Sequence, residues 1–314
     1  ANYLVARGLK PGEKISTICN NSVDFCKALF GIHRAGLVWV PINTMLGPDD
    51  MSYILDHAEV KFAVIDDNLH AQPDRRAALE QRGIALVGID LAGKAKAQGL
   101  ARFDDLIEGQ SDIEPEIAFD DRDLAMIIYT SGTTSRPKGA MHCHVAVVMA
   151  AMSNAIEMHL GRNDGITGQF PLFHCAAHVL LLTYLSVGGK LAIMRGFDPV
   201  ACMEAIQRDR LSVFIGLPAM YQVILDHPRR KEFDLSSLRA CIYTMAPMPK
   251  RPDRDVSGDH HVAAGPPARA LRQLLGRVAD RERDRDHGRR RQPAAARPDR
   301  RTGASRPQRH DGLL

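Results

Sequence analysis

The sequence predicts an α/β fold with mostly parallel sheets and packed helices over residues 1–250, followed by a low-complexity tail over residues 251–314. Two observations predict this organisation. Segments with apolar residues at helical spacing alternate with short apolar runs rich in β-branched residues, which is typical of helices packed on parallel strands. The composition then changes abruptly after Lys250. A chain of 314 residues is long enough for two modest domains or one large one.

In the first half of the chain, apolar residues recur at helical spacing between residues 20 and 36, which predicts a helix that Gly36 ends. Three consecutive polar residues can cap its start: Asn20, Asn21 and Ser22. The other elements expected here are strands at 37–40, 61–66 and 83–88 and a helix that begins near residue 48. Residues 70–120 are more polar and carry a weaker pattern.

The second half repeats this pattern. We expect strands at 124–129, 190–194, 212–215 and 238–243, and helices at 145–158, 178–186 and 199–208 and from residue 218. Asp198 followed by Pro199 is typical of a helix start. Four methionines are expected to fill the core: Met141, Met149, Met152 and Met158.

Composition excludes several classes of protein. No apolar run approaches the roughly 20 residues that span a bilayer, and the first residues do not resemble a signal peptide. The six cysteines are scattered without a C-x-x-C pair, which favours reduced thiols and a cytoplasmic location over a disulfide framework. Only 5% of residues are aromatic, which is unlike an aromatic-rich carbohydrate or nucleic-acid binder.

The tail differs from the rest in charge. Residues 251–314 contain 16 Arg and no Lys, for a net charge of +7, whereas residues 1–250 carry −3. The tail also has no Ile, Phe, Tyr, Trp, Met or Cys, so it cannot bury enough apolar area to offset its ordering entropy, and we predict that it is disordered. Three interpretations stay open: an out-of-frame translation of GC-rich coding sequence, a solvated extension, or an Arg-rich segment that binds nucleic acid non-specifically. The first is favoured, so no specific nucleic-acid partner is expected.

One loop carries most of the functional information. Residues 130–139, with sequence TSGTTSRPKG, follow the strand predicted at 124–129 and precede a predicted helix. Hydroxyl side chains, glycines that permit close approach, and a lysine can together donate to phosphate oxygens. The spacing is not that of a Walker loop, G-x-x-x-x-G-K-[ST]. The sequence therefore predicts a phosphate-binding loop.

Four segments in order resemble the adenylate-forming superfamily, which includes acyl-CoA synthetases. Residues 129–139 resemble its nucleotide-phosphate loop, 36–43 (GLVWVPIN) its first core motif, 170–174 (FPLFH) its aromatic-His motif and 244–249 (TMAPMP) its adenine loop. The resemblance runs from about residue 2 to residue 250. Ser135 and Met245 stand where the family usually has smaller residues.

The resemblance implies a two-step ligase. A carboxylate attacks the α-phosphorus of Mg-ATP, pyrophosphate leaves, and the thiol of coenzyme A then displaces AMP from the acyl-adenylate. ATP, Mg²⁺ and coenzyme A are thus the implied co-substrates and cofactors. His174 would lie between the nucleotide and the acyl pocket. The residues implied in nucleotide binding are Thr130, Ser131, Gly132, Thr133, Thr134, Ser135, Lys138, Gly139, Met245, Ala246 and Pro247.

The sequence says less about the acid substrate and about bound metals. Residues 178–185 and 216–221 are apolar without a charged residue, which favours a fatty or aryl acid over an amino acid. His174 with Cys175 and His178, and the run 142–144, lack a closed set of ligands, so no protein metal site is expected. His142 and His144 are expected to point apart on a helix.

The sequence also departs from the family. It has no Thr-Glu pair, whose glutamate the resemblance implies for magnesium, and no Thr-Gly-Asp triplet for the ribose. No lysine follows Lys250 to meet the α-phosphate. Since each lost charge-stabilising group commonly costs about 10²- to 10³-fold in rate, we expect a truncated chain with negligible turnover. Two alternatives are a nucleotide- or acyl-binding module without catalysis and an Arg-tailed protein that interacts with nucleic acid.

Overall fold

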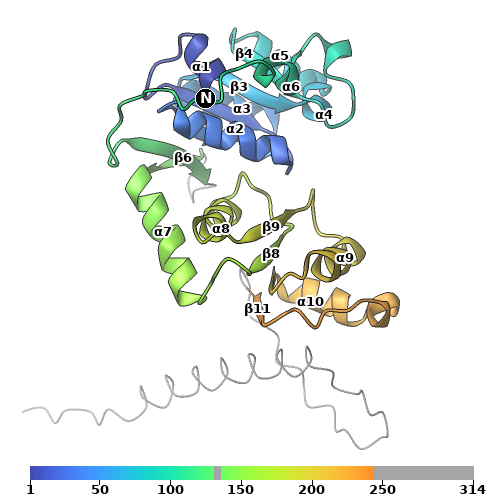
Figure 1. Cartoon of the computed structure of the whole chain (residues 1–314). Helices are drawn as coiled ribbons and strands as arrows, with labels where there is room; N and C mark the ends of the chain where they lie inside the picture. Colours follow the sequence, from blue (N-terminus) through green and yellow to red (C-terminus); the bar gives the residue numbers. More distant parts are fainter. Residues whose placement is uncertain (131–135, 244–314) are drawn as a thin grey trace, which may run out of the picture. The chain divides into compact units, whose positions relative to one another are not determined.

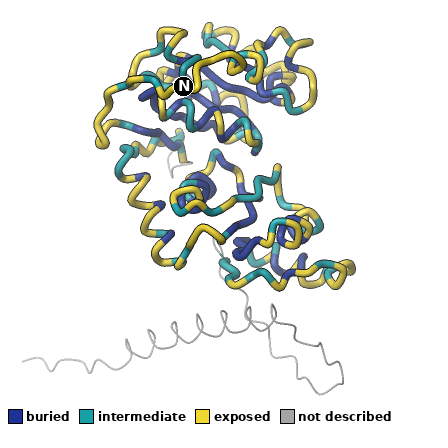
Figure 2. Tube along the Cα trace, viewed as in Figure 1, coloured by how far each residue is buried: buried dark blue, intermediate teal, exposed yellow. Residues whose placement is uncertain are grey.

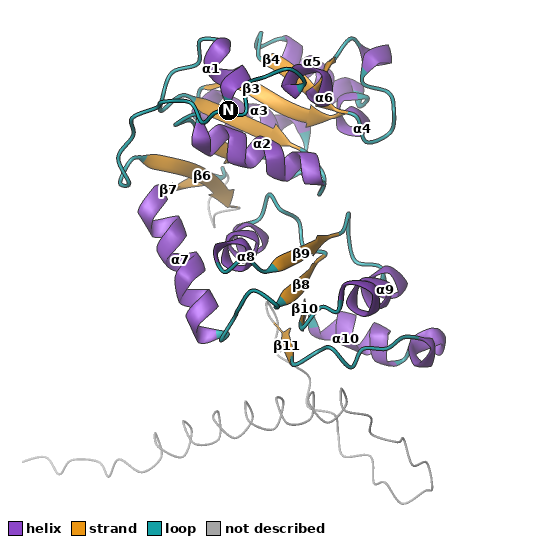
Figure 3. Cartoon of the chain, in the orientation of Figure 1, coloured by secondary structure: helices purple, strands orange, loops and turns teal. Residues whose placement is uncertain are grey.

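The computed structural model of the chain describes residues 1–130 and 136–243. In this part of the chain, eleven strands form two sheets (Figures 1 and 3). The seven-stranded sheet has the order β5-β4-β3-β1-β2-β6-β7, and the four-stranded sheet the order β11-β10-β8-β9. Every pairing is parallel except that of β6 with β7. The expected α/β architecture with mostly parallel sheets is therefore confirmed.

The seven-stranded sheet is built from the first half of the chain and the hairpin that follows it. Its strands are β1 (Lys14–Ile18), β2 (Val38–Pro41), β3 (Val60–Asp66), β4 (Ala85–Ile89), β5 (Ala101–Arg102), β6 (Leu124–Thr130) and β7 (Lys138–Cys143). Its helices are α1 (Asn2–Ala6), α2 (Val23–Arg34), α3 (Pro48–His57), α4 (Asp67–His70), α5 (Pro73–Glu80) and α6 (Phe103–Ile107), with a 3₁₀ turn η1 (Lys96–Gln98).

The four-stranded sheet follows along the chain. It contains β8 (Gly165–Gly168), β9 (Lys190–Ile193), β10 (Val213–Gly216) and β11 (Ala240–Tyr243). The helices of this half are α7 (His144–Glu157), α8 (Cys175–Ser186), α9 (Pro199–Asp209) and α10 (Pro218–Leu225), with a 3₁₀ turn η2 (Pro228–Glu232). Asp198 caps α9 as expected, because its side chain accepts from the Ala201 N–H at 2.6 Å.

The start of α2 resolves a choice that the sequence left open. Ser22 is the cap: its hydroxyl accepts a hydrogen bond from the Phe25 N–H at 3.0 Å. The neighbouring Asn21 is buried and joins the two sheets instead. Its side-chain amide donates to the carbonyl oxygens of Phe170 at 2.8 Å and Met194 at 2.9 Å. Gly36 follows the helix with φ +67°, a conformation that favours glycine.

The core contains residues of several predicted strands, whereas the strands predicted at 190–194 and 238–243 have no buried residue. Trp39 of β2 is fully buried, and its indole N–H donates to the Thr17 hydroxyl of β1 at 2.9 Å. One apolar cluster includes buried residues of both sheets, such as Trp39, Ile166 and Val213. Figure 2 shows buried residues along β1, β2 and β3 and exposed residues along much of α7.

Two expectations for the middle of the chain are wrong. Residues 138–143 form strand β7, which pairs with β6, so the hydroxyl-rich loop connects two strands and does not lead directly into a helix. His142 accordingly lies on a strand, and α7 begins only at His144. The methionines are not all core residues either, because Met141, Met149 and Met152 are 67%, 55% and 48% exposed.

Candidate functional site

The predicted phosphate-binding loop is the tip of the β6–β7 hairpin. Thr130, the last residue of β6, pairs with Lys138, the first residue of β7, and both are exposed. The antiparallel pairing therefore places a hydroxyl and an ammonium group next to each other at the loop end of the hairpin. Lys138 forms no ion pair with any described residue, so its charge is available to a ligand.

Most of the other predicted nucleotide-binding residues lie outside the described part of the chain. They are Ser131, Gly132, Thr133, Thr134 and Ser135 at the hairpin tip, and Met245, Ala246 and Pro247 after β11. The structure therefore places Thr130, Lys138, Gly139 and His174 from the predicted set.

Gly139 has a packing role in the hairpin. It pairs directly with Tyr129 across the two strands. A Cβ atom at Gly139 would lie 2.7 Å from Ile127 Cγ2 and 3.1 Å from Tyr129 Cζ. The first distance is shorter than real Cβ contacts and the second is tight, so the absent side chain makes room for the side chains of Ile127 and Tyr129. Binding of phosphate by Gly139 remains a prediction.

Helix α3 contacts both ends of the hairpin loop, which the sequence analysis did not foresee. The Tyr129 hydroxyl lies 2.7 Å from His57 Nδ1. On the other side of the loop, the Arg136 guanidinium lies over the Tyr53 ring, 5.1 Å from its centroid. Burial, followed by the nearby Tyr53 hydroxyl, raises the pKa of Tyr129 above its usual value. The available signal was the spacing of Tyr53 and His57, which are four residues apart on one helix face.

His174 occupies the turn between β8 and α8. It is the N-cap of α8, and its Nδ1 accepts from the Ala176 N–H at 3.2 Å. The side chain is exposed and forms no hydrogen bond with a described residue of the hairpin. The segment that carries it is held by Asn21, whose Oδ1 accepts from the Leu172 N–H at 2.7 Å. The predicted location of His174 between a nucleotide and an acyl pocket stays a prediction.

One turn further along α8, His178 is buried in an aromatic cluster. Its ring centroid lies 4.7 Å from that of Trp39 and 6.2 Å from that of His33. Neither ring nitrogen of His178 has a hydrogen-bond partner among the described residues. Burial, and to a lesser degree His142, lowers the pKa of His178 to about 4. This imidazole is therefore neutral at pH 7 and packs as an apolar ring.

The described residues contain no group of three or more His, Cys, Asp or Glu side chains placed to hold a metal ion. All six cysteines are free thiols. No helix in the described ranges is long and apolar enough to cross a bilayer.

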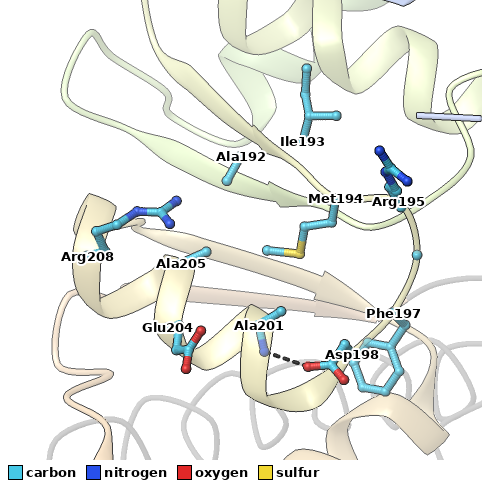
Figure 4. Close-up of a pocket in the computed structure, with 11 residues that line it drawn as sticks. Ala192, Ile193, Met194, Arg195, Phe197, Asp198, Ala201, Glu204, Ala205 and Arg208 are labelled. Atoms are coloured by element: carbon cyan, nitrogen blue, oxygen red, sulfur yellow. Dashed lines mark hydrogen bonds between the residues drawn. The ribbon is translucent and has the colours of Figure 1, made fainter. Parts of the chain in front are cut away.

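A separate cavity of about 540 Å³ lies between β9 and α9 (Figure 4). Its charged groups are Arg195 and Asp198 from the loop after β9, and Glu204 and Arg208 from α9. Arg208 forms an ion pair with Asp209 at 2.6 Å. None of the predicted site residues lines this cavity.

Comparison with known proteins shows the family to which the chain belongs. The profile of the AMP-binding enzyme family matches residues 1–262, and the chain belongs to this family. It is 32% identical over 250 residues to a feruloyl-CoA synthase of Amycolatopsis sp, covering 79% of this chain and 47% of that protein. It is 29% identical over 257 residues to the long-chain-fatty-acid–CoA ligase FadD13 of Mycobacterium tuberculosis, covering 80% and 48%. The chain thus spans about half the length of the curated relatives it matches.

Solved structures show the same relationship. The N-terminal domain of FACL13 from Mycobacterium tuberculosis, with a bound inhibitor, superposes with a TM-score of 0.70 at 28% identity, covering 79% of this chain and 61% of that one. ATP-bound MatB from Rhodopseudomonas palustris superposes with a TM-score of 0.65 at 27% identity, covering 79% and 47%.

Proposed function

We propose that the chain serves in the ATP-dependent activation of a carboxylic acid, which is then transferred to coenzyme A. The carboxylate oxygen attacks the α-phosphorus, pyrophosphate leaves, and the coenzyme A thiolate then attacks the acyl carbon and releases AMP. The relatives support this proposal, since their names describe CoA ligases and synthases and one similar structure contains ATP.

The pairing of Thr130 with Lys138 is the observation that carries the proposal. In the first step an anion must approach a polyanion, so positive charge beside the phosphates lowers the barrier more than a protein nucleophile could. The unpaired ammonium of Lys138 supplies that charge, and the hydroxyl of Thr130 can donate to a phosphate oxygen. We assign the hydroxyl and glycine residues 131–135 and Gly139 to the same loop function.

Two other groups belong to the proposal. His174 would orient or gate the acyl group beside the nucleotide, and residues 245–247 would contact the adenine. Mg²⁺ is usual in this chemistry as the partner of ATP. The described residues offer no set of ligands for it, and we derive no step through the metal. The free cysteines agree with a reducing compartment, and a cytoplasmic location is part of the proposal.

For the acid, we propose a fatty or aryl substrate. Helix α8 is apolar apart from His178 and Thr183, which are buried, and Ser186 at its end, which is exposed. It contains no Asp, Glu, Lys or Arg that could pair with an amino group or a second carboxylate. The relatives include a feruloyl-CoA synthase and a long-chain-fatty-acid–CoA ligase. An acid panel that includes amino acids tests this assignment, and a preference for an amino acid would contradict it.

A second candidate function is nucleotide binding without turnover by the 314-residue polypeptide. It is favoured by one observation: the sequence has neither a Thr-Glu pair nor a Thr-Gly-Asp triplet. Pyrophosphate release with ATP and a panel of carboxylates separates the two candidates, because vigorous release would contradict the second.

Nucleotide binding itself is tested by titration calorimetry with ATP. Lys138→Ala should raise the dissociation constant for ATP roughly 10- to 100-fold, which is the usual effect of losing a hydrogen bond to a charged group. Lys231→Ala is the matched control, because Lys231 is an exposed lysine in η2 without an ion pair to a described residue. Equal ATP affinity in the wild type and Lys138→Ala would contradict the assignment of the loop.

A further inference from the structure

The two flanks of the hairpin loop converge on one face of α3. Tyr129 lies before the loop and reaches His57 through its hydroxyl, with the two rings 5.8 Å apart in an edge-to-face arrangement at 86°. Arg136 lies within the loop, two residues before Lys138, and stacks on Tyr53. The rings of Tyr53 and His57 are themselves 5.2 Å apart. A continuous series of contacts therefore connects the two ends of the loop through α3.

The two α3 side chains lie at the edge of the core. The buried face of α3 consists of Met51, Ile54 and Leu55. Tyr53 is half-buried and packs against that apolar cluster, whereas His57 is exposed. Arg136 forms no ion pair with a described residue, and stacking on a ring leaves its N–H donors available to a ligand. Because Tyr53 is anchored on the core, it can hold the Arg136 guanidinium in one place.

We propose that Tyr53 and His57 are positioning residues for Thr130 and Lys138, the described pair of the phosphate-binding loop, and that they act on this pair through Tyr129 and Arg136. The inference rests on the proposed binding of ATP by this loop. Tyr129 is next to Thr130, and Arg136 is two residues before Lys138. Holding Tyr129 and Arg136 on one helix fixes the positions of Thr130 and Lys138 before the ligand arrives, so less conformational entropy is lost on binding.

The test uses the full 314-residue chain and two probes, ATP and inorganic tripolyphosphate. We expect Tyr53→Leu to raise the dissociation constants for ATP and tripolyphosphate by the same factor, roughly 3- to 10-fold. The reason is that Thr130 and Lys138 are then no longer preorganised, while no contact with the adenine changes. Tyr53→Phe keeps the ring under Arg136 and should bind both probes like the wild type. If Tyr53→Phe binds as weakly as Tyr53→Leu, the stacking role is wrong.

A double-mutant cycle checks the route through Arg136. Tyr53→Leu should add little further loss in an Arg136→Ala background, since the stack is already absent. A full additional loss there would contradict the proposal. A second cycle combines His57→Ala with Tyr129→Phe, which remove the two ends of one hydrogen bond. The double variant should lose no more ATP affinity than either single variant.

Two controls distinguish a positioning role from a general loss of stability. Arg229→Ala removes a matched stack, since the Arg229 guanidinium lies 5.4 Å from the Phe233 ring centroid beside η2; it should leave ATP affinity unchanged. The fluorescence of Trp39, the single tryptophan, reports whether each variant keeps its core. Loss of affinity in Tyr53→Leu that merely follows a lowered unfolding midpoint would overturn a positioning role.

The outcomes also distinguish this inference from the proposed function. If the wild type fails to bind ATP, or Lys138→Ala binds as well as the wild type, both proposals fall together. If Lys138→Ala loses affinity while Tyr53→Leu and His57→Ala do not, the loop assignment stands and the positioning role alone is wrong.

Discussion

At the scale of single residues, His178 shows how burial changes the chemistry of a side chain. In an unfolded chain its imidazole would titrate near pH 6.5, whereas in the fold its pKa is about 4. The partner ring of His33 is shifted in the same direction, because burial and the neighbouring His178 and His144 lower its pKa to about 3. Both rings are therefore neutral where the protein is most stable.

These shifts predict a pH-dependent stability. Below pH 6.5 the unfolded state binds more protons than the folded state, so this contribution to the free energy of unfolding is complete above pH 6.5 and decreases as the pH falls toward 4. The slope should approach about 1.4 kcal/mol per pH unit for each fully shifted histidine. His178→Leu should flatten it by roughly half and cost little at pH 7, since no hydrogen bond of the imidazole is lost. Urea unfolding followed by Trp39 fluorescence between pH 4 and 7 measures both effects; identical slopes would contradict the assignment.

Gly139 is a second residue whose role depends on a close contact. An alanine there would place its Cβ against Ile127 and Tyr129, so Gly139→Ala should lower the free energy of unfolding by about 1–3 kcal/mol. Gly161→Ala is the control, because a Cβ at Gly161 would meet nothing within 4 Å. Urea unfolding of the two variants makes the comparison, and equal midpoints would show that Tyr129 does not need the space.

At the scale of elements, Asn21 connects β1 and α2 to the second sheet. Asn21→Ala would leave the carbonyl oxygens of Phe170 and Met194 and the N–H of Leu172 without their partner. We expect a loss of about 2–4 kcal/mol in the free energy of unfolding, since buried polar groups left unpaired are costly. Ser22→Ala, which removes only the cap of α2, should cost about 1 kcal/mol. Equal effects in urea unfolding would mean that Asn21 does not join the sheets.

The elements also show what local sequence can and cannot predict. The helices α2, α3 and α9 were predictable because a periodic apolar face and a cap or proline mark each one. Helix α7 has no such start signal, and only its long apolar run predicted it. Strand β7 was missed because residues 138–143 lack a clear apolar alternation, and only their pairing with β6 makes them a strand. Strand β8 contains two glycines in four residues, which local propensity disfavours.

The candidate site likewise combines residues that local sequence marks with residues that only the fold brings together. The hairpin residues Thr130 and Lys138 were recognisable because their chemistry lies within one short segment. Their contacts with α3 depend on residues more than seventy positions away, as in the His57–Tyr129 bond, and no local pattern encodes such a pairing. The rings around His178 belong to residues far away in the sequence, so the apolar helix that contains His178 could not predict them.

At the scale of the whole molecule, the division of the chain near residue 250 remains a prediction. Residues 251–314 have no Ile, Phe, Tyr, Trp, Met or Cys and carry a net charge of +7. Such a segment has little apolar area to bury against the rest of the chain. Removing it should therefore leave the urea midpoint and the ATP dissociation constant of the remaining chain unchanged, since the predicted phosphate loop and the core residues all precede residue 251.

The charge of this segment gives the same experiment a second measurement. The full chain should bind duplex DNA only weakly, without sequence preference, and less as salt rises, because Arg contacts to phosphate release counterions. The chain without residues 251–314 should lose that binding, as residues 1–250 carry a net charge of −3. A lowered urea midpoint on deletion would show that the segment packs on the folded part. Salt-resistant, sequence-selective DNA binding by the full chain would instead favour the nucleic-acid interpretation of the tail over the two others.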